Sequence, residues 1–405
     1  MMRLFNTLGR RCEIFRPVNK KVVNMFTCGP SVYQRAHIGN FRTFLFEDLL
    51  VRYLEYAGHA VHRGMNFTDV EDKAIREAGL KRISVRELTD RNIDEFLREM
   101  ALLGMKLPDY LPRASDCVET AVEIIALLLE RGVAYWHKGN VYYDPLRHPG
   151  FGKLYGLDMS KWPKKRVRFH RDTYPGIQWN MGDFILWHGH RAGDPDSWKT
   201  GIGWGRPAWN IQDPSMILHY FDETLSLYCG GIDNLYRHHD YTLAILESVR
   251  SYPMARYWLH CHHLYVDGKK MSKSRGNIHY TDTLLRKGYT PQEIRFFLLY
   301  GHYRSKLDYS DEAMRSVTEL LRSFRRAVSL LGERAGGRTP PEAESARKLR
   351  SIFEERMNDD LDVRGAFDGL CRYGAGLDLS ALGAGEAAGM VRALREIDGV
   401  LGVLF

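Results

Sequence analysis

The residues best suited to chemistry form a short basic loop of lysines, serines and a glycine. The run reads Lys269-Lys270-Met271-Ser272-Lys273-Ser274-Arg275-Gly276-Asn277. Lysine ammonium groups neutralise phosphate charge, and small hydroxyl donors orient phosphate oxygens. A basic run is by itself most often a solvated surface. The loop therefore indicates a polyphosphate site only if a second feature supports it.

That second feature lies near the N-terminus. The apolar run 22–27 ends in Cys28-Gly29-Pro30 and is followed by His37-Ile38-Gly39-Asn40 and an amphipathic stretch at 41–56. This pattern predicts a buried strand, a tight turn and the start of a helix. Such a turn would place an imidazole, an amide and free backbone N–H groups where an anion binds.

The elements around both stretches predict an α/β fold. A strand at 22–27, a helix from 41 and a strand at 60–67 imply a right-handed parallel crossover, and hence a doubly wound sheet. A strand at 258–266 is predicted to return to that sheet just before the lysine loop. Helical spacing predicts further helices, at 83–112, 118–131, 211–227, 242–250, 292–300, 311–331, 346–357 and 363–377.

The two stretches, in this order, resemble the two ATP-binding signatures of class I aminoacyl-tRNA synthetases. The flanking sequence is similar to the cysteinyl-tRNA synthetase family in particular, at 28–33, 66–73, 183–187 and 301–305. The resemblance extends from about residue 3 to the C-terminus. It implies an ATP-dependent ligase that forms an aminoacyl-AMP and passes the amino acid to an acceptor.

The resemblance also implies an architecture. We expect a Rossmann-type doubly wound parallel sheet with an inserted connective domain, followed by a C-terminal α-helical bundle. The corresponding segments are 1–112 for the first half of the catalytic domain, 113–205 for the insertion, 206–280 for the second half and 281–405 for the bundle.

By resemblance, the reaction needs ATP with Mg²⁺, and four residues carry the catalysis: His37, Asn40, Lys270 and Lys273. Further ATP contacts are implied at Gly39, Gly230, Gly231, Asp233, Met271, Ser272 and Ser274. Asn40 stands where the family usually has a second histidine. An amide still donates a hydrogen bond, so we expect this change to be tolerated.

The amino-acid pocket departs further from the family. Cysteinyl enzymes hold a zinc ion through Cys, Cys, His and Glu, and zinc favours a substrate thiolate. Here Cys28 and His238 match two of these ligands, whereas Asp213 replaces the second cysteine and Thr242 replaces the glutamate.

Two interpretations of this pocket remain open. In one, Cys28, Asp213 and His238 still bind zinc and the substrate supplies the fourth ligand. In the other, the metal is lost and Asp213 accepts hydrogen bonds from a different substrate. Thr68 and Trp209 match family residues that line the pocket. The residues that line the pocket match the family, whereas two of the metal-ligand positions differ. This combination indicates a changed substrate.

The functional hypotheses differ in the acceptor, the molecule that receives the activated amino acid. Nothing in the sequence corresponds to the family's separate anticodon-binding region, and the length is similar to that of the tRNA-independent mycothiol-pathway ligase, which joins activated cysteine to an amino sugar. We therefore expect activation of cysteine or a related small amino acid, with a small amine or a tRNA not selected through its anticodon as acceptor. The alternatives are a genuine ligase for tRNA(Cys) and a non-catalytic paralogue that binds RNA or a partner.

Composition sets broader limits. The 405-residue chain carries a net charge of +8 and has a pI near 9.0, which weakly favours a polyanionic partner. Its six cysteines are scattered singly, so neither a disulfide framework nor a zinc ribbon is predicted. No signal peptide or membrane span is recognisable. We expect a cytoplasmic monomer.

Overall fold

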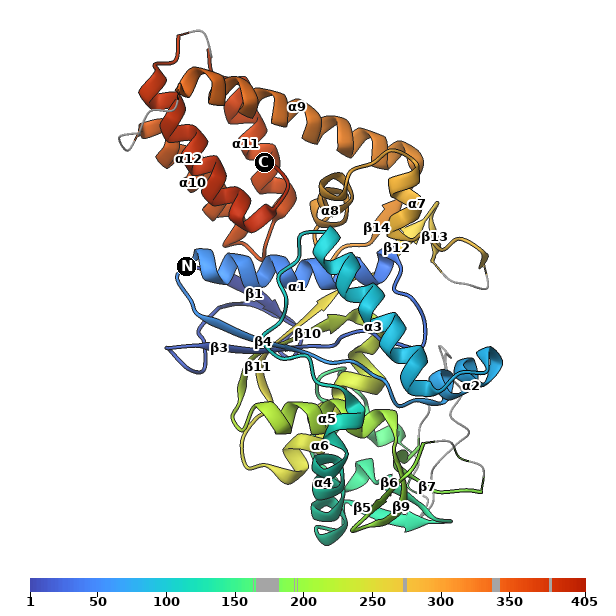
Figure 1. The fold of residues 1–405 in the computed structure, drawn as a ribbon. Helices are drawn as coiled ribbons and strands as arrows, with labels where there is room; N and C mark the ends of the chain where they lie inside the picture. Colours follow the sequence, from blue (N-terminus) through green and yellow to red (C-terminus); the bar gives the residue numbers. More distant parts are fainter. Residues whose placement is uncertain are drawn as a thin grey trace.

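The structure is a computed structural model of the 405-residue chain, and it describes residues 1–162, 164, 182–192, 194, 196–271, 275–336, 343–378 and 381–405. Three tiers are visible in Figure 1: a helical bundle, a central sheet crossed by one long helix, and a region built from further helices and a second sheet. The long helix is α1 (Ile38–Tyr56), and the helices of the third tier are α4 (Val118–Glu130), α5 (Trp209–Tyr220) and α6 (Tyr241–Val249). The candidate site residues come mainly from the central tier.

The central sheet has four strands in the order β11, β10, β3 and β4, and every neighbouring pair is parallel. The strands are β11 (Ala255–Cys261), β10 (Leu225–Gly231), β3 (Val23–Thr27) and β4 (Val61–Met65). Helix α1 (Ile38–Tyr56) connects β3 to β4. The predicted parallel α/β sheet is confirmed.

Side chains of this sheet alternate between two cores, as the period of a strand requires. Met25 and Leu227 belong to the core that contains α1 and the bundle. Phe26 and Tyr228 belong to the opposite core, with α4, α5 and α6. Because both faces are covered, the parallel strands are apolar on both sides.

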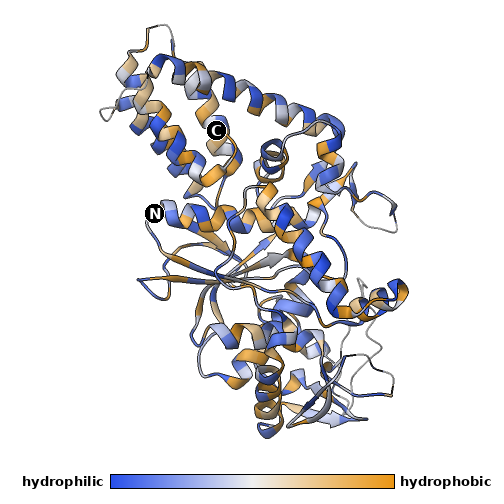
Figure 2. Ribbon diagram, viewed as in Figure 1, coloured by the Kyte–Doolittle hydropathy of each residue, from blue (hydrophilic) through white to orange (hydrophobic). Residues whose placement is uncertain are grey.

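The segment after β4 begins with helices and continues into an antiparallel sheet. The helices are α2 (Asp72–Lys81), α3 (Val85–Leu102) and α4 (Val118–Glu130). The sheet has the order β5-β6-β7-β9-β8 and consists of β5 (Ala134–His137), β6 (Asn140–Tyr143), β7 (Phe184–Gly189), β8 (Trp198–Thr200) and β9 (Gly203–Pro207). Figure 2 shows α4 as a markedly apolar helix, which fits its place in the second core.

The chain returns to the central sheet through α5 (Trp209–Tyr220), β10, α6 (Tyr241–Val249) and β11. A small sheet follows, formed by β12 (Leu264–Val266), β13 (Lys269–Lys270) and β14 (Leu307–Tyr309). The remaining helices are α7 (Thr281–Arg286), α8 (Pro291–Tyr300), α9 (Asp311–Ala335), α10 (Glu344–Met357), α11 (Val363–Ala375) and α12 (Ala384–Leu401). The predicted C-terminal helices are confirmed.

Two sequence predictions are wrong in detail. The helix expected at 211–227 ends at Tyr220, and Leu225 begins β10. Strand pairing on both sides of β10 overrides its helical spacing, because the segment is buried between β3 and β11. The strand expected at 258–266 is divided, since β11 ends at Cys261 and β12 pairs in another sheet. The hairpin of β1 (Arg3–Asn6) and β2 (Arg11–Ile14) was not predicted.

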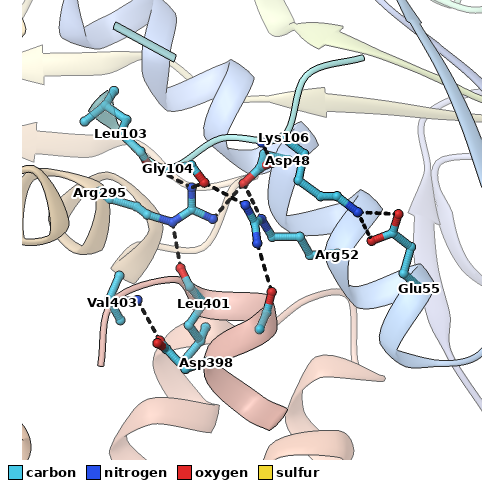
Figure 3. A network of polar contacts seen from close by, with 11 residues as sticks. Asp48, Arg52, Glu55, Leu103, Gly104, Lys106, Arg295, Asp398, Leu401 and Val403 are labelled. Carbon is cyan, nitrogen blue, oxygen red and sulfur yellow. Dashed lines mark hydrogen bonds and ion pairs between the residues drawn. The ribbon is translucent and has the colours of Figure 1, made fainter. Parts of the chain in front are cut away.

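Helix α1 is attached to the C-terminal bundle by a buried polar network, drawn in Figure 3. The Arg295 guanidinium donates to Asp48 Oδ2 at 2.7 Å and to the Leu401 carbonyl at 2.6 Å. Arg52 donates to the same Asp48 oxygen at 2.9 Å and to the Gly399 carbonyl at 3.0 Å. One carboxylate of α1 thus joins α8 to the end of α12.

Within the described part of the chain, no helix is both long and apolar enough to span a membrane.

Candidate active site

The first signature forms the start of α1. His37 is the N-cap residue, and its Nδ1 accepts a hydrogen bond from the Asn40 backbone N–H at 3.2 Å. The Asn40 side-chain oxygen accepts from the His37 backbone N–H at 3.0 Å. This reciprocal capping box holds the helix end that faces the site. Asn40 therefore has a structural role that explains how an amide is accommodated here.

The lysine loop meets this helix end. A Cβ atom on Gly39 would lie 3.2 Å from Met271 Cε and 3.1 Å from the His37 ring, so only glycine leaves both contacts unstrained. Downstream of the loop, the His279 carbonyl accepts from the Ile38 backbone N–H at 3.0 Å. Both sides of the lysine loop therefore flank the first turn of α1. Ser272, Lys273 and Ser274 lie outside the described residues.

The end of β10 forms a further wall. Gly230 and Gly231 end the strand, and the exposed Asp233 follows in a short 3₁₀ turn. The pKa of the His263 imidazole is below its usual value, mainly because the ring is buried. The Asp233 carboxylate raises this pKa, and the exposed Lys270 ammonium lowers it. The end of β10 is therefore a glycine pair followed by an exposed carboxylate.

The predicted pocket carboxylate is buried and fully engaged. Asp213, on α5, has no exposed surface. Its Oδ1 accepts from the Asn66 side-chain amide at 3.0 Å, and its Oδ2 accepts from the Tyr228 hydroxyl at 2.7 Å. The same Oδ2 lies 2.9 Å from His238 Nε2. Three separate segments thus converge on one carboxylate.

The other predicted pocket residues surround this carboxylate. Asn66 also donates to Thr68 Oγ1 at 3.4 Å. The Trp209 ring stacks on His238, with ring centroids 4.2 Å apart and planes 7° apart. The fold therefore brings Thr68, Trp209, Asp213 and His238 together from positions far apart in the sequence.

A group of three possible metal ligands lies beside this pocket. One ligand atom each from the buried residues Cys28, His238 and His239 falls within 4.8 Å of the others. Both histidines belong to a π-helical turn, Leu235–Asp240, a rare geometry that occurs often at functional sites. Asp213 is not part of this group. Thr242 is directed elsewhere, since its hydroxyl donates to the His238 carbonyl at 2.8 Å.

These donors suit a cation. Two buried ring nitrogens, His238 Nδ1 and His239 Nε2, have no hydrogen-bond partner among the described residues. Burial and the nearby Asp213 charge raise the pKa of the Cys28 thiol well above its usual value, although a hydrogen bond from Asn234 lowers it. Burial lowers the pKa of His239 well below its usual value. Sulfur and neutral imidazole donors fit a zinc-like ion.

Three residues of the pocket escaped the sequence analysis. Asn66 lies within a recognised family motif but was given no role. Tyr228 was assigned no role either. His239 was passed over because the resemblance points to His238 alone, although two adjacent histidines are themselves a metal-binding signal.

Comparison with solved structures defines the class of fold. A Mycobacterium tuberculosis methionyl-tRNA synthetase bound by methionyl-adenylate matches with a TM-score of 0.66, at 16% identity, over 94% of this chain and 92% of that one. A LeuRS–tRNA–LeuAMS complex from Agrobacterium radiobacter matches with a TM-score of 0.65, at 12% identity, over 96% and 85%. The fold is that of the class I aminoacyl-tRNA synthetases.

Sequence comparison identifies the family. Residues 14–319 match the family described as "tRNA synthetases class I (C) catalytic domain". The cysteine–tRNA ligase of Chlamydia pneumoniae is 36% identical over 99% of this chain and 86% of its own length; that of Chlamydia muridarum is 35% identical over 99% and 87%. The chain therefore belongs to the cysteinyl branch of the class I aminoacyl-tRNA synthetases, a family of ATP-using ligases.

Proposed function

We propose that this protein activates cysteine, or a related small amino acid, as an aminoacyl-AMP. The observation that carries the proposal is the meeting of both signatures at one helix end: Gly39 of the first lies against Met271 of the second. The pocket of Cys28, Asp213 and His238 supports an amino-acid site beside that phosphate site.

The chemistry is a displacement at phosphorus. The substrate carboxylate attacks the α-phosphorus of ATP, a C–O–P bond forms, and pyrophosphate leaves with the electron pair of the broken P–O bond. Such reactions depend on positioning and on stabilisation of phosphate charge. His37 and backbone N–H groups near Gly39 would hold the phosphates, with Asn40 fixing the helix end. Lys270 and Lys273 would neutralise the pyrophosphate, whose charge Mg²⁺ also offsets.

The rest of the nucleotide would lie along the end of β10. Gly230 and Gly231 allow close approach of the adenosine, and the exposed Asp233 carboxylate would accept hydrogen bonds from ribose hydroxyls. Met271, Ser272 and Ser274 would complete the contacts from the lysine loop. This assignment follows the family signatures residue by residue.

The amino acid would bind between the phosphate site and the metal donors. Thr68 and Trp209 would line the pocket, and Asp213 would set the orientation of His238. Cys28 and His238 would hold a zinc ion, which when bound supplies a Lewis acid selective for a thiolate. Asp213 and Thr242 stand at two positions where the family has zinc ligands. Because these two residues differ from the family, cysteine analogues should be tested as substrates alongside cysteine.

The acceptor is a separate proposal. The printed activity of the relatives, cysteine–tRNA ligase, supports tRNA. A small amine such as an amino sugar is the second candidate, because the altered pocket favours a changed reaction. Transfer of the activated amino acid to tRNA(Cys), to tRNA lacking its anticodon stem and to amino sugars would separate these acceptors.

Amino-acid-dependent ATP–pyrophosphate exchange, without tRNA, tests activation. We expect exchange with cysteine or a close analogue, and suppression by a zinc chelator. Exchange with an unrelated amino acid, indifferent to chelator, would overturn the thiol assignment. Absence of exchange with every amino acid, together with absence of ATP binding, would favour the non-catalytic alternative.

A further inference from the structure

The metal donors differ from those that the family resemblance implies. We infer that His239, and not Asp213, is the third protein ligand of a zinc-like cation, and that Asp213 acts on this cation only through His238. The inference deepens the proposed function and rests on it for the substrate. The ligand set becomes one thiolate and two imidazoles, with a fourth position for a substrate thiolate.

The first argument is that Asp213 is already satisfied. The buried carboxylate accepts from Asn66 at 3.0 Å and from Tyr228 at 2.7 Å, and it lies 2.9 Å from His238 Nε2. A metal bound directly to Asp213 would compete with these contacts, and displacing Asn66 or Tyr228 would leave a buried donor without its partner. Asp213 is instead placed as the carboxylate of a carboxylate–histidine–metal arrangement.

The second argument concerns the His238 tautomer. Because Nε2 faces a carboxylate, Nε2 carries the proton, and Nδ1 keeps its lone pair. Nδ1 is also a buried ring nitrogen that lacks a hydrogen-bond partner in the described part of the chain. His238 therefore presents Nδ1 to the metal, while Asp213 holds the opposite side of the ring.

The third argument concerns His239, whose ring is held in the same way. His239 Nδ1 lies 2.8 Å from His260 Nε2, and His260 Nδ1 lies 2.8 Å from the Thr7 hydroxyl. When Nδ1 donates to His260, Nε2 of His239 keeps its lone pair. That Nε2 is the second buried nitrogen without a partner among the residues described.

A close approach keeps this nitrogen near the sulfur. A Cβ atom at Gly230 would lie 2.9 Å from His239 Nε2 and 3.2 Å from Cys28 Cβ. Glycine at this position leaves the space between imidazole and thiol open. Asn234 donates to Cys28 Sγ at 3.4 Å, which fixes the position of the sulfur.

Charge then specifies the substrate group. A divalent cation with one thiolate and two neutral imidazoles keeps a charge of +1, and an anionic fourth ligand neutralises it. A soft sulfur and nitrogen set prefers a thiolate among anionic donors. The family set of two thiolates, one imidazole and one carboxylate would already carry −1. The altered set therefore binds a thiolate substrate more tightly than a neutral side chain such as a hydroxyl.

Zinc X-ray absorption and zinc content of the full-length protein test the ligand assignment. We expect about one zinc per chain, with one sulfur and two imidazoles bound. His239→Ala should lose one imidazole signal and most of the zinc. Asp213→Ala should keep the sulfur and both imidazoles, and its affinity should fall about 10–100-fold, as for other outer-sphere carboxylates. His62→Ala, at an exposed position on β4, is the matched control.

His239→Cys distinguishes the loss of a ligand from a folding defect in His239→Ala. Its second thiolate should restore zinc binding, with two sulfurs in the spectrum. A wild-type spectrum with one imidazole and a carboxylate oxygen, unchanged in His239→Ala, would overturn the inference. Absence of zinc from active protein would also overturn it and leave the proposed activation standing. Zinc bound as inferred, without any amino-acid activation, would refute the proposed function instead.

Discussion

At the scale of single residues, the departures from the family pattern are each matched by a specific contact. Asn40 closes the capping box of α1, Thr242 bonds the His238 carbonyl, and Asp213 accepts from Asn66 and Tyr228. Random loss of function would leave buried polar groups unpaired, at a cost of about 1–3 kcal/mol each. Asp213 and Thr242 instead both contact His238, and Asn40 holds the start of α1.

Lys270→Ala should lower the rate of ATP–pyrophosphate exchange by about 10²–10³-fold, as expected when one donor to transition-state charge is removed. The KM for the amino acid should change little, because the role proposed for Lys270 is at the phosphates. Lys269→Ala is the matched control, since this neighbouring exposed lysine points to the other side of β13. Turnover of Lys270→Ala equal to that of the wild type would refute the assigned role.

Glu71→Gln should stabilise the protein at alkaline pH. Glu71 is only 9% exposed, and burial raises its pKa from 4.5 to about 7, although Lys73 lowers it. Between these pKa values the folded protein keeps a proton on Glu71 that the unfolded chain releases. The contribution of Glu71 to the free energy of unfolding therefore falls as the pH rises from 4.5 to 7. The variant should gain about 3 kcal/mol of unfolding free energy at pH 8 and under about 1 kcal/mol at pH 5.

Urea denaturation of Glu71→Gln and wild type at both pH values measures this difference. A gain that is equal at pH 5 and pH 8 would show that proton binding is not its cause.

At the scale of elements, α1 aligns the two ATP signatures. Its buried Arg42 donates to four backbone carbonyls: those of His262, Leu298, His302 and Ser305. His262 lies between β11 and β12, the strand that leads to the lysine loop. The other three carbonyls lie in α8 and the loop after it. A single guanidinium therefore fixes the helix that starts at His37 against the base of the second signature.

Arg42→Met should reduce the free energy of unfolding by about 3–5 kcal/mol, because it leaves buried carbonyls without their charged donor. Arg42→Lys should recover little, since an ammonium cannot reproduce the planar fork of donors. Arg86→Met, at an exposed ion pair on α3, is the control and should change stability by less than about 0.5 kcal/mol. Urea denaturation measures all three. A loss below about 1 kcal/mol for Arg42→Met would contradict this account.

At the scale of the whole molecule, the bundle and the catalytic tier share one core and one polar junction. The apolar cluster runs from β3 and α1 into α9, α10, α11 and α12. Asp48, Arg52 and Arg295 lie at this junction, as Figure 3 shows. The start of α1 lies at the proposed phosphate site and its middle contacts the bundle, so this one helix connects both.

Asp48→Asn should weaken the junction, because it leaves the buried Arg295 without its anionic partner. We expect a loss of about 3–5 kcal/mol in unfolding free energy. Amide hydrogen exchange should accelerate first at the end of α12, where Arg295 binds the Leu401 carbonyl. Exchange in β5 to β9, which lie on the far side of the central sheet, serves as the internal control. Uniform acceleration over the whole chain would contradict a local role.

Local pattern was enough to predict the elements around α1. A buried strand, a glycine-containing turn and a helix follow one another within residues 22–56, and the resemblance of two short signatures predicted a phosphate site there. The start of β10 was missed, since its strand state depends on pairing with β3 and β11. The pairing with β3 joins segments roughly 200 residues apart, which no local period reports.

The proposed metal donors could be chosen only from tertiary contacts. Residue type made Cys28, Asp213 and His238 equal candidates, because a carboxylate, a thiol and an imidazole can each bind zinc. Which of them faces the others depends on α5, β10 and the π-helical turn, which direct Asp213 toward Tyr228 and His238 and place His239 beside Cys28. Hydrogen bonds between these distant elements determine which ring nitrogens of His238 and His239 remain without a hydrogen bond among the described residues. That geometry cannot be predicted from residue types or local spacing.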